Sequence, residues 1–318
     1  MLTRKLYLEW KEDKIRATSF CPGWVKTDMG TDAAMLTVSR TDFSLPNVTI
    51  VRGELRNYSW KNRLFLSPSL SCLSRPTMVS ILVTGANRGI GLGLVRQLVQ
   101  EPSVTPVIAT ARNIDKATDL KAIKSPKLHL VQLEMIDEQS IAQDVTKVSG
   151  IVGENGLDFL VNNAGIFNQA KLAGDLSKAL VMEQFEVNTV APLLLTNMFR
   201  GLLKKAADKK GSSHIANISS TLGSIEFAPQ IETPMPIYAI YAISKAALNM
   251  LTRRLFLEWK EDKIRATSFC PGYVKTDMGT DAAMLTLEES TVPLAKLILS
   301  LTEEHNGLYY RYNGEKIP

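Results

Sequence analysis

Residues 78–318 alternate between short apolar runs and longer amphipathic stretches. The apolar runs are rich in Val and Ile and have the length of strands; they fall at 79–84, 105–111, 127–133, 157–162, 213–218, 264–270 and 307–312. Between the first two runs, Ile90, Leu94, Val95 and Leu98 recur at the spacing of one helical face. Longer helical patterns cover 176–207 and 239–259. This alternation predicts an α/β fold with a Rossmann-type, doubly wound, seven-stranded parallel sheet and helices on both faces.

The first part of the chain does not continue this pattern, because it is a partial copy of a later part. Residues 1–37 repeat residues 250–286, and only three positions differ. The differing pairs are Lys5 and Arg254, Tyr7 and Phe256, and Trp24 and Tyr273. A single, near-identical copy is a sequence duplication and not a structural repeat. We therefore expect 1–37 to be a non-functional fragment left by a fusion or a gene-model error, 38–77 to be a disordered linker, and 78–318 to be the functional domain.

Two alternatives to this division of the chain stay open. The prefix can be a real N-terminal extension that docks on the domain or on a partner. Alternatively, the full chain is not a stable product, because the strand-forming segment 15–20 can compete for the sheet position of its counterpart 264–269.

The net charge of +5 belongs to the prefix. Residues 1–77 hold 12 basic and 7 acidic residues, which leaves 25 of each sign in 78–318, so we expect no nucleic-acid partner. No apolar run reaches the roughly 18 residues of a membrane span, and we expect no membrane association. The three cysteines and three histidines lack the spacing of a disulfide framework or a metal site, which fits a reducing, cytoplasmic protein without metal.

The first candidate motif is a glycine loop that directly follows a predicted strand and opens a helix. It reads Thr84-Gly85-Ala86-Asn87-Arg88-Gly89-Ile90-Gly91. Glycines allow a tight turn, and the free N–H groups of a helix N-terminus bind the phosphates of a dinucleotide. By itself this spacing is also compatible with an ordinary strand-to-helix turn. The second motif, Asn162-Asn163-Ala164-Gly165, is equally compatible with an Asx turn and with a ribose-binding segment.

The third motif pairs a phenol with an ammonium. Tyr241 and Lys245 lie four residues apart, on one face of a predicted helix, and Ser220 precedes them. A phenol with a pKa near 10 is a poor acid–base catalyst at neutral pH, and lowering that pKa to about 7 requires roughly 4 kcal/mol. An ammonium about 4 Å away supplies a comparable magnitude. A Y-x-x-x-K pair alone is common, and it becomes specific only after the two preceding motifs.

Taken in this order, the motifs resemble the short-chain dehydrogenase/reductase family over all of 78–318. The resemblance implies that Tyr241 is the general acid/base, that Lys245 lowers its pKa and binds the nicotinamide ribose, that Ser220 polarises the carbonyl, and that Asn188 helps to hold a proton-relay water. Ser219 is the less favoured serine, and Tyr238 is expected to form a wall of the substrate pocket. The implied cofactor-binding residues are Gly85, Asn87, Arg88, Gly89, Ile90, Gly91, Arg112, Glu134, Met135, Asn162, Ala164, Gly165, Tyr241, Lys245, Pro271, Gly272, Val274 and Thr276.

The choice of cofactor follows from the end of the second predicted strand. NAD-preferring proteins of this kind usually carry an acidic residue there, whereas this strand ends in Ala111-Arg112. Arg88 and Arg112 suit a 2′-phosphate, so the sequence predicts NADP(H), with NAD(H) less favoured. The alternative is that both arginines are solvated surface residues. Glu134 stands where the family typically has Asp, which puts its contact with the adenine in doubt.

Within the family, the TGANRGIGLGLV opening and the C-terminal GLYYRYNGEKIP resemble the sniffer/C-factor group of carbonyl reductases. The expected function is NADPH-dependent reduction of a small-molecule carbonyl (an aldehyde, ketone or quinone) to an alcohol, by a homodimer or homotetramer. The segment 221–240 is predicted to line the substrate site. The alternative function is a catalytically silent NADP(H)-binding regulatory or signalling protein on the same fold.

Overall fold

The computed structural model describes residues 16–19, 35–39, 48–51, 78–169, 176–227 and 238–318. The chain divides into two compact units, Met1–Leu73 and Ser74–Pro318. Each unit is described by itself.

The described part of the first unit is a three-stranded antiparallel sheet. Its strands are β1 (Arg16–Ser19), β2 (Met35–Ser39) and β3 (Val48–Val51), in the order β1-β2-β3. β3 and part of β2 fall inside the predicted linker, where the VTIV sequence has strong strand propensity. The strand-forming segment 15–20 contains β1, which pairs with β2. Its counterpart 264–269 lies in the large sheet of the second unit.

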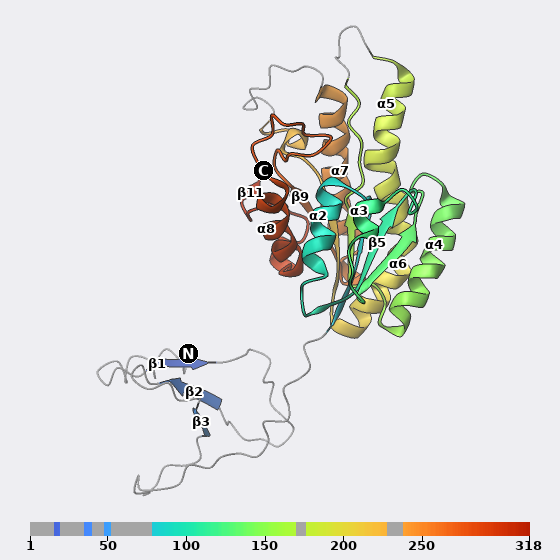
Figure 1. The fold of residues 1–318 in the computed structure, drawn as a ribbon. Helices are drawn as coiled ribbons and strands as arrows, with labels where there is room; N and C mark the ends of the chain where they lie inside the picture. Colours follow the sequence, from blue (N-terminus) through green and yellow to red (C-terminus); the bar gives the residue numbers. More distant parts are fainter. Residues whose placement is uncertain (1–15, 20–34, 40–47, 52–77, 170–175, 228–237) are drawn as a thin grey trace, which may run out of the picture. The chain divides into compact units, whose positions relative to one another are not determined.

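The second unit is built on an eight-stranded sheet (Figure 1). Its strands are β4 (Val79–Val83), β5 (Val104–Ala111), β6 (Leu128–Gln132), β7 (Phe159–Asn162), β8 (Ser213–Ile218), β9 (Ile264–Cys270), β10 (Tyr309–Arg311) and β11 (Lys316–Ile317). The order is β11-β10-β9-β8-β7-β4-β5-β6, and all neighbours are parallel except β10 and β11. The doubly wound parallel sheet is therefore confirmed. Its strand order reverses at β4, which places a crevice between the carboxyl ends of β4 and β7.

The eighth strand corrects the prediction of seven. β11 has only two residues and pairs antiparallel with β10, as Tyr309 opposite Ile317 and Tyr310 opposite Lys316. A two-residue strand is too short to show an alternating pattern. The Asn-Gly pair before it, with Gly314 at a φ of 88°, is a hairpin signal that indicates the turn.

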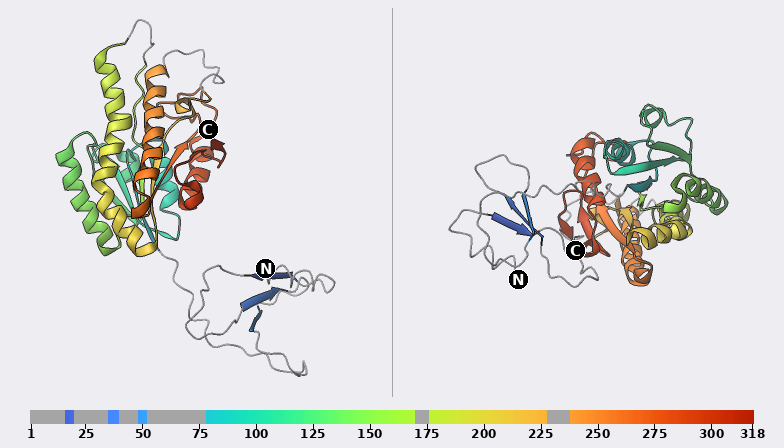
Figure 2. Two further views of the ribbon diagram at one scale, coloured as in Figure 1. Left: turned by 180° about the vertical axis from the view of Figure 1, so that it is seen from behind. Right: turned by 90° about the horizontal axis from the view of Figure 1, so that it is seen from below.

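The helices cover both faces of the sheet, and alternate strand residues serve the two faces. They are α2 (Gly89–Leu98), α3 (Thr118–Lys121), α4 (Glu138–Val152), α5 (Lys178–Phe185), α6 (Ala191–Lys210), α7 (Ala239–Glu258) and α8 (Leu287–Leu299). Ile81 and Val83 pack in the core formed with α2 and α8, whereas Leu82 between them packs in the core formed with α4 and α6. Figure 2 shows α4, α6 and α7 covering the second face.

The long helix predicted over 176–207 is interrupted in the structure. Between α5 and α6 the backbone forms a π-helical turn, Glu186–Val190, and Asn188 lies in its middle. Such turns are rare and are frequent at functional sites. Short 3₁₀ turns occur at Gly153–Asn155, Thr221–Gly223, Lys260–Asp262 and Glu303–His305. Among the residues that the structure describes, no helix is long and apolar enough to cross a membrane.

Candidate active site

The glycine loop joins β4 to α2 and leaves the N-terminus of α2 open to a ligand. Gly85 has a φ of 61°, and a Cβ on it would lie 2.8 Å from the Cβ of Ala164, so glycine is needed for both reasons. Arg88 occupies the N-cap position without a side-chain cap, and the first turn has no acidic residue. Free N–H groups and the positive end of the helix dipole therefore face the crevice, which favours an anion there.

Asn163 ties the end of β7 to this loop. Its Nδ2 donates to the carbonyl oxygens of Thr84 at 2.8 Å and Gly85 at 3.1 Å, and its backbone N–H donates to Thr84 Oγ1 at 3.0 Å. Asn162, which the sequence placed at the cofactor, instead points into the core. There its Nδ2 donates to Thr196 Oγ1 at 3.0 Å and to Asn217 Oδ1 at 2.8 Å.

A cavity of about 560 Å³ runs along the carboxyl ends of β4, β5, β6 and β7. The predicted cofactor residues that line it are Gly85, Asn87, Arg88, Gly89, Ile90, Arg112, Glu134, Met135, Ala164, Gly165, Tyr241, Lys245, Pro271 and Thr276. Gly91 and Asn162 are not among its lining residues, and Gly272 and Val274 line a neighbouring cavity instead. Lining residues that the sequence interpretation missed include Thr110, Asn113, Lys116, Asn163, Ile166, Val187, Asp277 and Met278.

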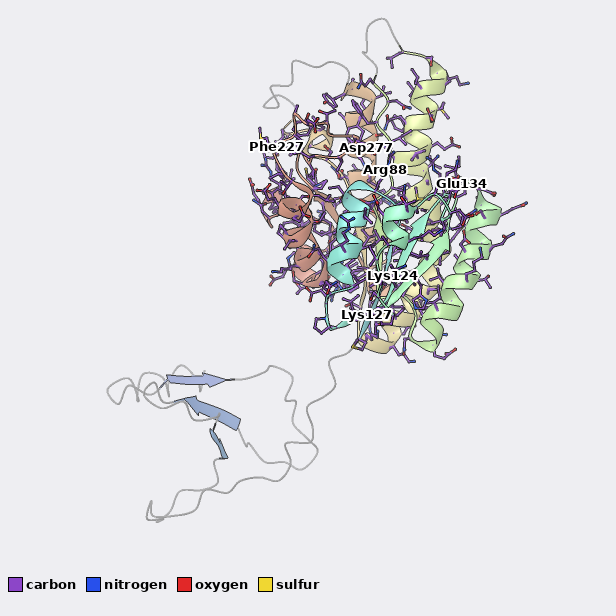
Figure 3. All side chains as sticks on the ribbon, in the orientation of Figure 1. Arg88, Lys124, Lys127, Glu134, Phe227 and Asp277 are labelled. Carbon is purple, nitrogen blue, oxygen red and sulfur yellow. The ribbon has the colours of Figure 1, made fainter. Side chains whose placement is uncertain are left out.

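One end of this cavity is basic. Arg88, Arg112 and Lys116 all line it, and Asn113 holds the backbone of Lys116 through a 3.0 Å hydrogen bond to its Oδ1. β5 ends at Ala111, and no carboxylate follows it directly. Arg88 Nη1 lies 2.8 Å from Asp277 Oδ2, and both side chains are largely exposed. Figure 3 shows Arg88 and Asp277 side by side, at the same edge of the sheet as Glu134.

Tyr241 and Lys245 lie one turn apart on α7 and face the same cavity. Lys245 Nζ is 5.6 Å from the centre of the Tyr241 ring and donates to the Ile218 carbonyl oxygen at 2.8 Å. Burial lowers the pKa of Lys245 to about 8. Burial also raises the pKa of Tyr241, and the Ser220 hydroxyl acts in the opposite direction.

The expectation that Lys245 lowers the pKa of Tyr241 stays a prediction, since burial has the largest effect on that pKa in this structure. The Nζ of Lys245 is hydrogen-bonded to the Ile218 carbonyl oxygen at the end of β8. Desolvation penalises the charged form of both groups, so it favours a protonated phenol and weakens the ammonium.

The two serines after β8 have different surroundings. Ser220 lines the smaller neighbouring cavity, and its Oγ accepts a hydrogen bond from the Leu222 backbone N–H at 3.3 Å. Ser219 lines both cavities, and its Oγ donates to the Lys245 carbonyl oxygen at 3.4 Å. Of the two serines, Ser220 is the one whose hydroxyl lowers the pKa of Tyr241, and its role at the carbonyl stays a prediction.

Asn188 is fully buried behind the cavity and joins three segments. Its Oδ1 accepts from the Ile166 N–H at 2.9 Å, and its Nδ2 donates to the Ile166 carbonyl oxygen at 3.0 Å and to Ser244 Oγ at 3.1 Å. A Cβ on Gly165 would lie 3.1 Å from Asn188 Oδ1 and 3.6 Å from Lys245 Nζ. Asn188 thus fixes the loop after β7 against α7; its role in holding a water stays a prediction.

The smaller cavity, of about 130 Å³, opens beside Tyr241, which lines both cavities. Its walls are Ile90, Phe167, Ser219, Ser220, Leu222, Tyr238, Tyr241, Pro271, Gly272, Tyr273, Val274, Thr276, Met278 and Gly279, and none of these is charged. Phe167 stacks on Tyr238 at 4.8 Å between ring centres and meets Tyr241 edge-on at 5.5 Å. Of the predicted substrate segment 221–240, Leu222 and Tyr238 line this cavity, and 228–237 lie outside the described residues.

A metal site is not indicated by the residues described. Within these ranges, no group of three His, Cys, Asp or Glu side chains is placed to hold a metal ion.

Comparison with known proteins gives consistent matches. The sequence model described as short chain dehydrogenase matches residues 79–284. A short-chain dehydrogenase of Pyricularia oryzae is 31% identical over 242 residues, which is 72% of this chain and 92% of that protein. The carbonyl reductase Sniffer of Drosophila melanogaster superposes with a TM-score of 0.70 at 34% identity, over 76% of this chain and 99% of that one. An NADPH-bound carbonyl reductase from chicken fatty liver gives a TM-score of 0.69 at 37% identity, over 76% and 98% of the two chains.

Proposed function

We propose a specific activity from one premise: the chain belongs to the short-chain dehydrogenase/reductase family of oxidoreductases. The proposed activity is the NADPH-dependent reduction of an uncharged aldehyde, ketone or quinone to the alcohol. The observation that carries it is the position of Tyr241, which lines both the dinucleotide-sized cavity and the small uncharged one. A proton donor at this junction can reach a carbonyl oxygen in the small cavity while a hydride arrives from the large one.

The residues of the large cavity fit NADP(H). The uncapped N-terminus of α2 suits the pyrophosphate, and the lack of a side chain on Gly85 lets the backbone approach closely. Arg88, Arg112 and Lys116 suit the 2′-phosphate, which NAD(H) lacks. The NADPH-bound chicken enzyme supports the same cofactor. When bound, NADPH supplies the hydride, and the protein supplies the proton and the orientation.

In the proposed mechanism, Ser220 donates a hydrogen bond to the carbonyl oxygen of the substrate and Tyr241 delivers a proton to that oxygen. Burial keeps the pKa of Tyr241 high, so the phenol is protonated at neutral pH, which is the form that a reduction requires. The ammonium of Lys245 stabilises the phenolate that remains after the transfer.

A panel of uncharged aldehydes, ketones and quinones tests this proposal directly. Oxidation of NADPH is followed with each compound, with NADH in parallel. We expect turnover with at least one class of carbonyl and a higher kcat/KM with NADPH than with NADH. Binding of NADPH without turnover of any compound would instead favour the catalytically silent alternative.

The proposed assembly is a homodimer or homotetramer formed through α7. Ile243, Met250 and Leu257 are 49%, 60% and 55% exposed, and their seven-residue spacing places them along one side of the helix. An exposed apolar stripe of this kind is typical of a protein interface. The proposed location is the cytoplasm, where the free thiol of Cys270 stays reduced.

A further inference from the structure

The duplicated prefix carries a second version of the sequence of one part of the catalytic unit. Residues 1–37 carry the copy of 250–286, and the three differences can be placed through their counterparts in the catalytic unit. Two counterparts, Arg254 and Phe256, are on α7 and line neither cavity. The third, Tyr273, is a wall of the small cavity, and the copy has Trp24 in its place.

The two changes on α7 are conservative and local. Arg254 forms an ion pair with Glu258 one turn away, with its Nε 2.9 Å from Glu258 Oε1, and the copy keeps a basic residue there. Phe256 packs against Gly307, and the guanidinium of Arg253 lies 5.1 Å from its ring centre. In the copy Tyr7 retains the ring. Neither change alters a group that a substrate could touch.

The change at Tyr273 differs from these two because it alters a wall of the small cavity. Hydrogen bonds hold the backbone at this position in place. The Tyr273 carbonyl oxygen accepts from the Leu285 N–H at 3.0 Å, and the Lys275 N–H donates to the Leu285 carbonyl oxygen at 2.8 Å. Gly272, with a φ of 85°, is packed closely against Leu285 and Tyr312. A substitution at Tyr273 therefore changes the wall of the cavity and leaves the path of the chain in place.

Tyr273 lies at the open side of the cavity and faces Tyr238. Tyr273 is 42% exposed although it lines the cavity, so it sits at the mouth. Burial and the nearby Tyr273 phenol both raise the pKa of Tyr238, which places the two hydroxyl groups within electrostatic reach of each other. Tryptophan carries a larger, bicyclic side chain and has one N–H donor where tyrosine has a hydroxyl that both donates and accepts.

We propose that Tyr273 determines the size of carbonyl that this chain accepts, and that the prefix records a sister protein in which tryptophan at the same position narrows the entrance. The inference rests on the proposed reductase function. A wall residue acts on a substrate through steric fit, and even one methylene of difference in an apolar pocket changes kcat/KM by about tenfold or more. A change from one ring to two fused rings in a cavity of about 130 Å³ is larger than that.

The experiment measures kcat/KM of the full chain for 2-naphthaldehyde and for benzaldehyde, with NADPH saturating. The quantity compared is the ratio of the two values, naphthaldehyde over benzaldehyde. Because both values come from one preparation, the fraction of folded enzyme cancels in the ratio. We expect Tyr273→Trp to lower the ratio at least about tenfold, and to leave the KM for NADPH within about twofold of that of the wild type.

Three control variants separate an effect of side-chain size at Tyr273 from an effect of its hydroxyl group and from effects of the other two differences. Tyr273→Phe removes the hydroxyl and keeps the ring, so its ratio stays within about twofold of the wild-type ratio if size is what matters. Arg254→Lys and Phe256→Tyr introduce the other two residues of the copy away from both cavities, and neither changes the ratio.

The outcomes are distinguishable. A ratio in Tyr273→Trp that is unchanged or raised would overturn the inference while leaving the reductase function intact. A change of the same size in Phe256→Tyr would also overturn it, since that residue does not reach the cavity. If the wild-type protein reduces neither aldehyde, nor any other carbonyl, the proposed function itself fails and the inference fails with it.

Discussion

Replacement of Lys245 by Met should abolish catalysis and at the same time stabilise the fold at neutral pH. Lys245 is 3% exposed, and its Nζ has one hydrogen-bond acceptor in the structure, the Ile218 carbonyl oxygen. Burial lowers its pKa from 10.5 to about 8. At about 1.4 kcal/mol for each pKa unit, keeping the ammonium in the folded protein costs about 3 kcal/mol at neutral pH.

Methionine fills a similar volume without a charge, but it leaves the Ile218 carbonyl oxygen without this donor. That loss costs about 1–3 kcal/mol. The net change in the free energy of unfolding at neutral pH is therefore a stabilisation of about 1 kcal/mol. The pH dependence of the difference is a sharper test than its size, because other titrating groups cancel between the two proteins.

The sign follows from proton binding. The folded-state pKa of Lys245 lies below the unfolded value, so between about pH 8 and pH 10.5 the unfolded chain binds more protons than the folded one. The free energy of unfolding of the wild type therefore rises relative to that of Lys245→Met, by up to about 1.4 kcal/mol for each pH unit in this window. The advantage of the variant at neutral pH should shrink and then reverse as the pH rises.

Urea unfolding of both full-length proteins at a series of pH values measures this difference. Lys296→Met, on the exposed side of α8, is the control and should show no such slope. A stability difference between wild type and Lys245→Met that stays constant from about pH 7 to about pH 10 would refute the argument, because it would mean that the buried amine is not destabilised as an ammonium.

Three further predictions concern the cofactor end and the assembly. Arg112→Asp should shift preference toward NADH, seen as at least a tenfold fall in the NADPH-to-NADH ratio of kcat/KM; an unchanged ratio would remove Arg112 from the 2′-phosphate site. Asp277→Asn releases Arg88 from an exposed ion pair, so the Kd for NADPH should fall a few-fold and the Kd for NADH should fall less. Fluorescence titration measures both values; weaker NADPH binding would mean that the Arg88–Asp277 pair closes over the cofactor and does not compete with it. Met250→Glu, in the exposed stripe of α7, should convert the oligomer to a monomer in size-exclusion chromatography with light scattering, and an unchanged mass would exclude this face.

The sheet could be predicted from the sequence because buried parallel strands are continuous apolar runs. The predicted strands 213–218 and 264–270 match β8 and β9, and the others differ by one or two residues at one or both ends. The π-helical turn at Glu186–Val190 could not be predicted, since one widened turn hardly changes the spacing of apolar residues along a long helix. β11 was missed because its pairing depends on a turn and not on its own two residues.

Site residues could be predicted where a motif fixes both residue type and spacing. They could not be predicted where their position in the site depends on the direction of a side chain or on a contact between distant parts of the sequence. Tyr241 lines the large cavity together with Lys245 and the small one together with Ser220. Asn162 was misplaced, although strand alternation contains the signal: Asn162 is two residues after Leu160, which packs in the core formed with α6, so both point the same way. The approach of Asp277 to Arg88 joins segments 189 residues apart, and no local pattern predicts it.

The central claim is that Tyr241 is the proton donor of an NADPH-dependent carbonyl reductase, and Tyr241→Phe tests it most directly. The substitution removes one hydroxyl and keeps the ring that Phe167 meets edge-on. General acid catalysis contributes about 100- to 10,000-fold, so kcat for the best substrate of the wild-type panel should fall at least about 100-fold, while the Kd for NADPH stays within about twofold. Turnover by Tyr241→Phe within about tenfold of wild type would contradict the account, because the proton would then have to come from another group.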